Sequence, residues 1–383
     1  MLVPPHGGSL INRVATGEAR EIAKEKAKSI KLIRVSIEKL KEIQNIAHGV
    51  FSPLKGFLTR EEITSVIETN RMLSGEYWTI PILLSVSEQD SRGIEIGETV
   101  AIGGHDGRAF AIMEIEDVFT IEKEAIAKSV FGTLDNAHPG VAKLFSSDPV
   151  HLGGAITLFD DIPMDYAVFY KTPEQTRQLF EANGWSTVVA FQTRNPPHRA
   201  HEYLQKTALE ICDGLFINPV IGQKKSGDFT DSVILQSYKT LIDLFYPMDR
   251  VLLSILPWEM RYAGPKEAIF HAIVRKNFGC SHHIIGRDHA GVGSYYDSFA
   301  AQKIFEEFPG LGIAPLCFEN SFYCTMCQNM GTMKTCPHDS SARLNPSGTK
   351  IRSIVTEGAK IHSGIMRPEI ADILSGANSP FVE

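Results

Sequence analysis

The sequence predicts an α/β protein with a β-rich N-terminal part, a central parallel sheet covered by helices, and a small C-terminal part. Three observations support this prediction. Short apolar runs separated by Gly, Asp and Ser fill residues 78–118, strand-like runs alternate with helical stretches over residues 186–286, and a cluster of Cys and His follows. A chain of 383 residues is also longer than one typical single-core domain, so we expect two or three domains.

The N-terminal part begins with a charged segment, residues 18–47, that is helical in pattern apart from an apolar-alternating stretch at 30–35. Thr59 with Glu62 predicts a capping box at the start of another helix. The runs WTIPILLSV, ETVAIGG and RAFAIMEIED then predict short strands. Residues 161–174 have the composition of a linker into the next part.

The central part alternates strands and helices. The runs STVVAF, GLFINPVI, RVLLSIL and HHIIG predict strands, with helices from about Pro197, near Ser232–Phe245 and over Pro265–Asn277 between them. This alternation predicts a parallel sheet, and ligands bind such sheets beyond the carboxyl ends of the strands. The residues that follow STVVAF and HHIIG are therefore the first candidates for a functional site.

Bulk composition argues against several classes of function. The chain has 43% hydrophobic and 22% charged residues and a net charge of −7, so nothing indicates a broad surface for nucleic acid or an anionic membrane. It has no signal-peptide pattern at its start and no apolar run of about 18 residues. We therefore expect a cytoplasmic protein with no nucleic-acid or membrane partner. In a reducing compartment, the crowding of three of the six cysteines favours a metal over disulfides.

The strongest candidate site is QTRNPPHRAH, residues 192–201, between a predicted strand and helix. Pro197 suits the first helical turn, whose free backbone N–H groups would form an anion site. His198 and His201 are three residues apart, so both imidazoles are expected on one helical face within reach of one polyphosphate.

Other side chains of this segment strengthen the interpretation. Arg194 offers a planar fork suited to tetrahedral oxyanions, and Gln192 and Asn195 offer neutral donors. An isolated HxxH is more often a capped helix start with two surface histidines. Six polar donors packed at one strand end favour phosphate binding instead.

Two weaker candidates lie downstream. GRDHAG, residues 286–291, follows the strand HHIIG; its glycines allow close backbone approach, and Arg287 and His289 add positive or hydrogen-bonding character. His282 and His283 point to opposite faces of their strand and are expected to be structural. The hydroxyls and arginine of SGTKIR, residues 347–352, suit a phosphate clamp, but a capped helix start explains them equally well.

A candidate metal site lies in FYCTMCQNMGTMKTCPH, where Cys324, Cys327, Cys336 and His338 supply four ligands suited to tetrahedral zinc. A single residue separates Cys336 from His338, so Asp339 or water stays open as the fourth ligand. No open coordination position is evident, and the zinc is expected to be structural.

The combination of QTRNPPHRAH, MRYAGPKEA and GRDHAG resembles the ATP sulfurylase family, the homo-oligomeric sulfate adenylyltransferases of bacteria and archaea. The similarity extends to HGVFSPLKGFL (residues 48–58) and PHGGSL, and so covers nearly the whole chain. The resemblance implies a PUA-like N-terminal domain over residues 1–165, a Rossmann-like nucleotidyltransferase domain over 166–320, and a small C-terminal domain with the zinc site over 321–383.

The activity that the resemblance implies is the reversible reaction of ATP and sulfate to adenylyl sulfate (APS) and pyrophosphate. The reaction serves sulfate assimilation, dissimilatory sulfate reduction or sulfur oxidation. Mg²⁺ would arrive with ATP, and the protein would be a homo-oligomer. Some relatives carry a fused adenylylsulfate kinase, but the sequence has no GxxxxGK(S/T) loop, so we do not expect that second activity.

The resemblance also implies residue roles. The residues expected to be catalytic are Thr193, Arg194 and Asn195. Those expected to bind ATP are Gln192, Thr193, Arg194, Asn195, His198, His201, Gly286, Arg287, Asp288 and His289. Those expected to bind sulfate are Gln192, Arg194 and Ala290. Ser347, Thr349 and Arg352 resemble, in looser spacing, an element that closes over the phosphates.

Two other interpretations compete with this one. One is an adenylyltransferase that uses the HxxH scaffold with a phosphorylated or pyridine-nucleotide acceptor; Gln192 and Arg194 before the HxxH argue instead for a small anion. The other is an RNA-binding protein built on the PUA-like part, which the acidic balance disfavours. The motif lacks Asp and Glu, which fits an acceptor that is already ionised and needs no general base.

Overall fold

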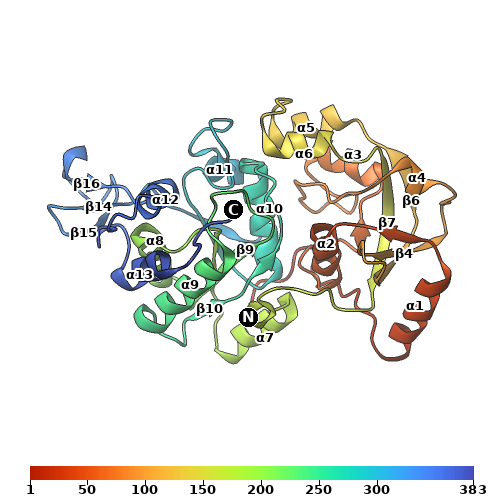
Figure 1. Ribbon diagram of the computed structural model, residues 1–383, viewed down its shortest axis with the longest axis horizontal. Coiled ribbons are helices and arrows are strands. Elements are labelled where there is room, and N and C mark those ends of the chain that lie inside the picture. Colours follow the sequence, from red (N-terminus) through yellow and green to blue (C-terminus); the bar gives the residue numbers. More distant parts are fainter.

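The computed structural model describes residues 1–383, which form three β-sheets with helices packed on and between them (Figure 1). A seven-stranded sheet belongs to the N-terminal part, a six-stranded sheet to the central part, and a three-stranded sheet to the C-terminal part. None of the helices has the length and the apolar run that crossing a bilayer requires. The mixed α/β class predicted from the sequence is confirmed.

The N-terminal sheet has the order β1-β4-β5-β7-β2, with β3 and β6 also pairing with β7. Its strands are β1 Leu32–Arg34, β2 Gly56–Phe57, β3 Leu84–Val86, β4 Thr99–Gly103, β5 Ala109–Glu114, β6 Asp117–Thr120 and β7 Val150–Leu158. Its helices are α1 Gly17–Ser29, α2 Ile37–Ala47, α3 Arg60–Thr69, α4 Glu88–Ser91, α5 Lys123–Phe131 and α6 Pro139–Phe145. The capping box of Thr59 and Glu62 is present at the start of α3.

The long strand β7 was not among the predicted strands, although it pairs with β2, β3, β5 and β6. Its sequence contains Gly153 and Gly154, which weaken a strand prediction. A Cβ on Gly154 would lie 2.0 Å from the carbonyl oxygen of Glu114, so glycine is required there by the close approach of neighbouring backbone.

The central sheet is parallel throughout, as predicted, with the order β10-β9-β8-β12-β13 and β11 pairing with β9. Its strands are β8 Val188–Thr193, β9 Gly214–Ile221, β10 Val251–Leu253, β11 Leu256–Pro257, β12 His282–Ile285 and β13 Ala314–Cys317. The helices of this part are α7 Pro173–Ala182, α8 Arg199–Leu209, α9 Asp231–Phe245, α10 Pro265–Asn277 and α11 Ala300–Lys303. Short 3-10 turns lie at η1 Ala167–Phe169 and η2 Ile304–Glu307.

Both faces of the central sheet are buried, and alternate residues of β8 enter different cores. Val188 and Ala190 belong to a cluster of 57 buried residues that also includes residues of α10 and of the N-terminal part. Val189 and Phe191 belong to a second cluster, of 21 residues, with α8, α9 and the C-terminal helix. This double burial explains why the strands read as continuous apolar runs.

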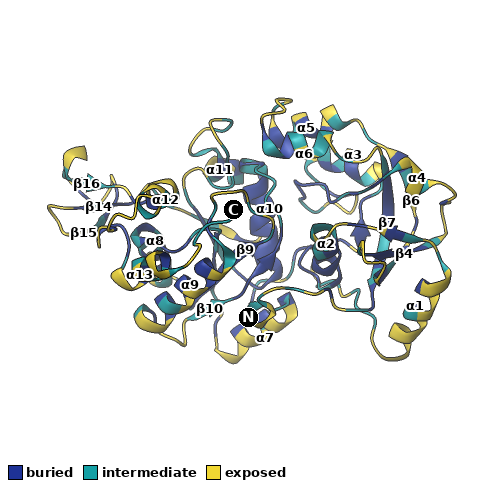
Figure 2. Ribbon diagram, in the orientation of Figure 1, coloured by how far each residue is buried: buried dark blue, intermediate teal, exposed yellow.

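Helix α10 lies between the central sheet and the N-terminal part, and Figure 2 shows it in the dark blue of buried residues. Every residue from Glu267 to Asn277 is buried. On the face of α10 that packs against the N-terminal part of the protein, the ring of Phe270 lies 5.3 Å from Trp78 and 5.5 Å from Phe51, measured between ring centroids. The two parts therefore share one core.

The C-terminal part combines a small antiparallel sheet with two helices. Its elements are β14 Phe322–Cys324, β15 Asn329–Gly331, η3 Ser340–Ala342, β16 Arg343–Leu344, α12 Gly348–Thr356 and α13 Pro368–Gly376. Ile351 of α12 and Ile370 and Leu374 of α13 pack into the cluster that covers α8 and α9. This packing holds α12 near the carboxyl edge of the central sheet.

Candidate active site

The segment QTRNPPHRAH crosses the carboxyl edge of β8, the central strand between β9 and β12. Thr193 ends the strand and orders the turn that follows: its hydroxyl accepts from the amide of Asn195 at 3.2 Å and donates to the carbonyl of Asn195 at 3.2 Å. This double contact holds Asn195 above the strand end. The segment therefore lies where the sequence predicted it.

The helix start differs from the prediction. Helix α8 begins at Arg199, and His198 is its N-cap with φ −121° and ψ 172°, so Pro197 lies outside the first helical turn. Two consecutive prolines keep the preceding residues extended, and the Nδ1 atom of His198 accepts from the amide of His201 at 3.4 Å. Part of the predicted amide anion site is thus occupied by a histidine side chain.

The two imidazoles of the HxxH lie together, as predicted. The rings of His198 and His201 stack with their centroids 3.7 Å apart and an interplanar angle of 24°. Burial lowers the pKa of His201 to about 4, and burial together with the neighbouring His201 lowers that of His198 well below its usual value. Both rings are neutral at pH 7, so they face a ligand as hydrogen-bonding groups and not as cations.

Arg194 is held by a residue to which the sequence interpretation assigned no role. Its Nη1 donates to the hydroxyl of Tyr262 at 2.5 Å, and its guanidinium carbon lies 5.0 Å from the centre of that ring. Gln192 contacts the same loop, because its Nε2 lies 3.3 Å from the sulfur of Met260. The loop that follows β11, residues 258–264, therefore forms one wall of the site.

This wall encloses a cavity of about 280 Å³ with Arg194 in its lining. The charged residues that line it are Lys143, Arg194, Lys224, Lys225 and Arg261 against Asp228 and Glu259. Lys224 is also tied to Asp231 at 2.6 Å, whereas the Lys225 ammonium lies 4.9 Å over the ring of Tyr262. The excess of positive charge makes the cavity suitable for an anion.

The GRDHAG turn follows β12, directly beside β8 in the sheet. Asp288 and Ala290 adopt left-handed backbone conformations, with φ of 57° and 55°. The carbonyl of Ala290 accepts from the amide of Gly264 at 3.1 Å, which joins this turn to the loop that holds Arg194. Arg287 instead pairs with Asp288 at 2.7 Å, with both side chains about half exposed.

The C-terminal candidate reaches the first motif. Ser347 caps α12 by accepting from the amide of Lys350 at 3.2 Å. Arg352 donates from Nη1 to the Oδ1 of Asn195 at 3.4 Å and from Nη2 to the hydroxyl of Thr349 at 3.3 Å. SGTKIR therefore both caps α12 and contacts the QTRNPPHRAH segment through Arg352.

The four proposed metal ligands converge around the β14–β15 hairpin. The ligand atoms of Cys324, Cys327, Cys336 and His338 all lie within 4.8 Å of one another. The Nδ1 of His338 is 3.2 to 3.6 Å from the three sulfurs, and the sulfurs of Cys327 and Cys336 are 3.9 Å apart. Zn–S bonds of about 2.3 Å give tetrahedral edges of roughly 3.8 Å, so the cluster suits zinc.

Asp339, the open alternative for the fourth ligand, is engaged elsewhere. Its Oδ1 accepts from the amide of Ser341 at 2.9 Å and caps η3.

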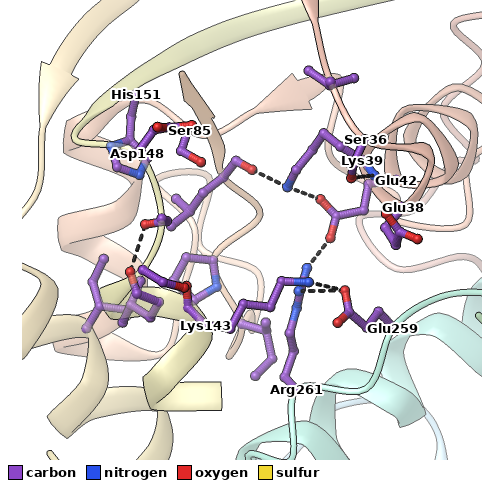
Figure 3. Close-up of a pocket in the computed structure, with 18 of the residues that line it drawn as sticks. Ser36, Glu38, Lys39, Glu42, Ser85, Lys143, Asp148, His151, Glu259 and Arg261 are labelled. Atoms are coloured by element: carbon purple, nitrogen blue, oxygen red, sulfur yellow. Dashed lines mark hydrogen bonds and ion pairs between the residues drawn. The ribbon is translucent and has the colours of Figure 1, made fainter. Parts of the chain in front are cut away.

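A second and larger cavity, of about 450 Å³, lies between the N-terminal part and the loop after β11 (Figure 3). Glu42 of α2 lies between Lys39 and Arg261 and forms an ion pair with each. Lys143 of α6 pairs with Glu259. Burial alone would raise the pKa of Glu42, but the charges of Lys39 and Arg261 outweigh it and lower the pKa. These pairs fix the loop from the N-terminal side.

We expect the Glu42→Gln variant to lose about 3 kcal/mol of unfolding free energy, because Lys39 would remain partly buried without its counter-ion and Arg261 would keep only its 3.9 Å contact with Glu259. Urea unfolding monitored by tryptophan fluorescence measures the change. Glu38→Gln is the matched control, since Glu38 lines the same cavity and forms no ion pair. Equal midpoints for the two variants would contradict a bracing role for Glu42.

The architecture and the site define a nucleotidyltransferase: a parallel sheet carries an HxxH segment and a cationic cavity at its carboxyl edge. The ATP-sulfurylase family model matches residues 167–377, and the PUA-like domain model matches residues 3–161. The chain belongs to the ATP-sulfurylase family.

Individual relatives agree with this assignment. The chain is 46% identical to the sulfate adenylyltransferase of Pyrococcus abyssi and 47% identical to that of Ignicoccus hospitalis, over 100% of each chain. A solved structure, a hexameric APS kinase from Thiobacillus denitrificans, superposes with a TM-score of 0.79 at 25% identity. That match covers 99% of this chain and 69% of the other.

Proposed function

We propose that the protein is a sulfate adenylyltransferase, in which a sulfate oxygen attacks the α-phosphorus of ATP. The new bond joins sulfate to the adenylyl group, and the bond from the α-phosphorus to the bridging oxygen breaks, which releases pyrophosphate with its negative charge. Sulfate is fully ionised at neutral pH, so no base has to remove a proton. The observation that carries the proposal is the cationic cavity lined by Arg194, a residue of the same segment that carries the stacked HxxH.

Gln192, Arg194 and the backbone of Ala290 are proposed to hold sulfate. Tyr262 fixes one arm of the Arg194 guanidinium, which leaves the other N–H groups for sulfate and the α-phosphate. The Oε1 of Gln192 is buried without a partner. Sulfate has only acceptors, so the amide must turn its Nε2 toward the anion and give up the weak contact with Met260.

The adenylyl and pyrophosphate groups are proposed to lie along the rest of the motif. Thr193, Arg194 and Asn195 would orient oxygens in the transition state. Arg352 would be held near them by its hydrogen bond to Asn195. His198 and His201 would donate hydrogen bonds to the β- and γ-phosphates. Such fixed donors stabilise charge as it develops on the bridging oxygen.

The GRDHAG turn, Gly286, Arg287, Asp288 and His289, is proposed to bind the nucleotide, and Mg²⁺ is proposed to enter with ATP. Cys324, Cys327, Cys336 and His338 are proposed to hold a structural zinc. We also propose three domains with boundaries near residues 165 and 320, a cytoplasmic location and a homo-oligomeric state, which the hexameric structural neighbour supports.

The direct test of the activity is pyrophosphate release from Mg-ATP in the presence of sulfate, or of molybdate in its place. We expect release to depend on the anion, because the acceptor completes the reaction. Release that is independent of both anions, or absent with both, would overturn the proposal.

Acceptor selectivity is a separate expectation. Hydrogen phosphate carries a proton that needs an acceptor, whereas the proposed pocket presents donors to its anion. Phosphate is therefore expected to inhibit weakly, while selenate and molybdate are used in place of sulfate. Competition experiments with varied sulfate measure this, and strong competitive inhibition by low millimolar phosphate would contradict the proposed pocket.

A further inference from the structure

Helix α10 is buried, yet it carries three ionisable residues along one face. Glu267, His271 and Arg275 lie at four-residue intervals along one face of a helix that is buried on all sides, and each is 0% exposed. Burying a charged group is costly unless it is paired and hydrogen-bonded. A row of three such groups therefore requires an explanation beyond packing.

The contacts of this row lead to both loops of the active site. The Oε1 of Glu267 accepts from the amide of Arg261 at 2.9 Å, and its Oε2 accepts from the amide of Ala263 at 3.0 Å. The Nε2 of His271 lies 3.3 Å from the same Oε1, without the geometry of a hydrogen bond. On its other side, the Nδ1 of His271 lies 3.1 Å from the Nε2 of His289, in the GRDHAG turn.

Burial keeps these imidazoles neutral, and for His271 it outweighs the Glu267 carboxylate, which raises the pKa. Burial is the main cause that lowers the pKa of His271, His289 and the adjacent His283, and the buried Arg275 lowers all three further. Glu267 forms no ion pair with Arg275; its charge acts on the guanidinium only at a distance, against the burial that lowers the pKa of Arg275. A neutral imidazole has one nitrogen that donates and one that accepts.

The position of each proton follows from the carboxylate, which can only accept. The contact between Glu267 and His271 is long, but a lone pair on Nε2 would face the carboxylate oxygen and be repelled, so the proton of His271 lies on Nε2. The Nδ1 of His271 is then an acceptor, and His289 must donate from its Nε2. The remaining nitrogen of His289, Nδ1, is left as an acceptor, and it makes no hydrogen bond within the chain.

His289 is half-buried and lines a cavity of about 170 Å³ beside the turn. Sulfate and the phosphates of ATP present almost only acceptors at neutral pH, so an acceptor nitrogen repels them. The nucleoside half of ATP is different, because its ribose hydroxyls and its 6-amino group are donors.

We propose that Glu267 and His271 are positioning residues that fix His289 in its Nε2–H tautomer, so that its Nδ1 accepts a hydrogen bond from the nucleoside. This proposal rests on the proposed function for the identity of the nucleotide. The sequence interpretation gave His289 positive or hydrogen-bonding character; the proposal makes it a neutral acceptor.

The tautomer is measured on the ligand-free protein, which separates it from any question of activity. Selective ¹⁵N-histidine labelling and long-range proton–nitrogen correlation spectra distinguish the two tautomers, with His289→Gln to assign the resonances. We expect the Nε2–H form in the wild type and a mixture in His271→Leu. A wild-type His289 protonated at Nδ1, or at both nitrogens, would overturn the proposal even if the protein makes adenylyl sulfate.

Function is tested with matched variants at one position. A glutamine at 271 can donate toward Glu267 and accept from His289, whereas leucine can do neither. We expect His271→Leu to raise the KM for ATP about tenfold with kcat little changed, and His271→Gln to restore most of the affinity. His282→Gln, on strand β12, is the control for replacing a histidine. Equal losses in the Leu and Gln variants would indicate packing alone and contradict the proposal.

Three analogues identify the donor: 2′-deoxy-ATP, 3′-deoxy-ATP and the triphosphate of purine riboside, which lacks the 6-amino group. Removing the contacted donor is expected to lower kcat/KM about tenfold in the wild type and less than about threefold in His271→Leu. Equal losses in both proteins for all three analogues would overturn the nucleoside contact. If no variant or wild type uses ATP with sulfate at all, the proposed function fails while the tautomer result stands.

Discussion

Replacing Arg194 by alanine is expected to lower turnover by about 10²-fold or more in a folded protein, judged from the effect of deleting single oxyanion donors. Arg194 is the residue that links the cationic cavity, the end of β8 and Tyr262. Its loss removes the proposed contact with both the acceptor anion and the α-phosphate. Initial rates of pyrophosphate release at saturating Mg-ATP and sulfate measure the effect.

Two matched variants sharpen this experiment. Arg250→Ala removes a half-exposed arginine at the start of β10, far along the chain from the motif, and is expected to leave turnover unchanged. Tyr262→Phe keeps the ring but removes the hydroxyl that holds Arg194, and a loss smaller than that of the alanine variant is expected. Near-normal turnover in a folded Arg194→Ala protein would exclude the proposed role.

Removing the proposed zinc is expected to unfold the β14–β15 hairpin locally. Structural zinc sites contribute roughly 10 kcal/mol of binding free energy at neutral pH, and the hairpin has only a small apolar cluster of its own, Phe322, Cys324 and Cys336. We expect Cys324→Ser, or treatment with a strong chelator, to abolish bound zinc and to expose residues 318–347 to protease. Elemental analysis and limited proteolysis measure the two outcomes.

The same change is expected to lower activity, although the cluster touches no proposed substrate group. Strand β16 pairs with β14 and leads directly into α12, which brings Arg352 to Asn195. Cys212→Ser is the control, because Cys212 is buried away from the cluster. Wild-type protein that contains no zinc after expression in zinc-supplemented medium would contradict the assignment.

Much of the fold could be predicted because its signals are local. The runs that became β8 and β9 are mostly apolar, β12 contains Ile284 and Ile285, and α10 has the predicted bounds of Pro265–Asn277, with Pro at its first position. Strand β7 was not predicted because two glycines interrupt its sequence. They are needed where neighbouring backbone approaches closely, and no local sequence pattern encodes that contact.

The candidate site was also predictable in part, because some of its segments follow strands that have local sequence signals. The rule that ligands bind beyond strand ends indicates the segments after β8 and β12, but β11 has only two residues and gives no strand signal of its own, although its carboxyl end leads to Met260 and Tyr262. The cap at His198 was missed because histidine is an uncommon N-cap and Pro197 gave the stronger local signal. The ion pair of Glu42 with Arg261 joins residues 219 positions apart, and only the fold brings them together.

The placement of α10 also has a consequence for how the chain folds. As the protein is synthesised, the strands of the N-terminal sheet emerge first, but the aromatic surface around Phe51 and Trp78 stays uncovered until Phe270 arrives. Neither sheet can complete its core alone, so we expect the two to unfold in a single cooperative transition. A nascent chain that stalls before residue 265 would expose this surface and is expected to depend on chaperones.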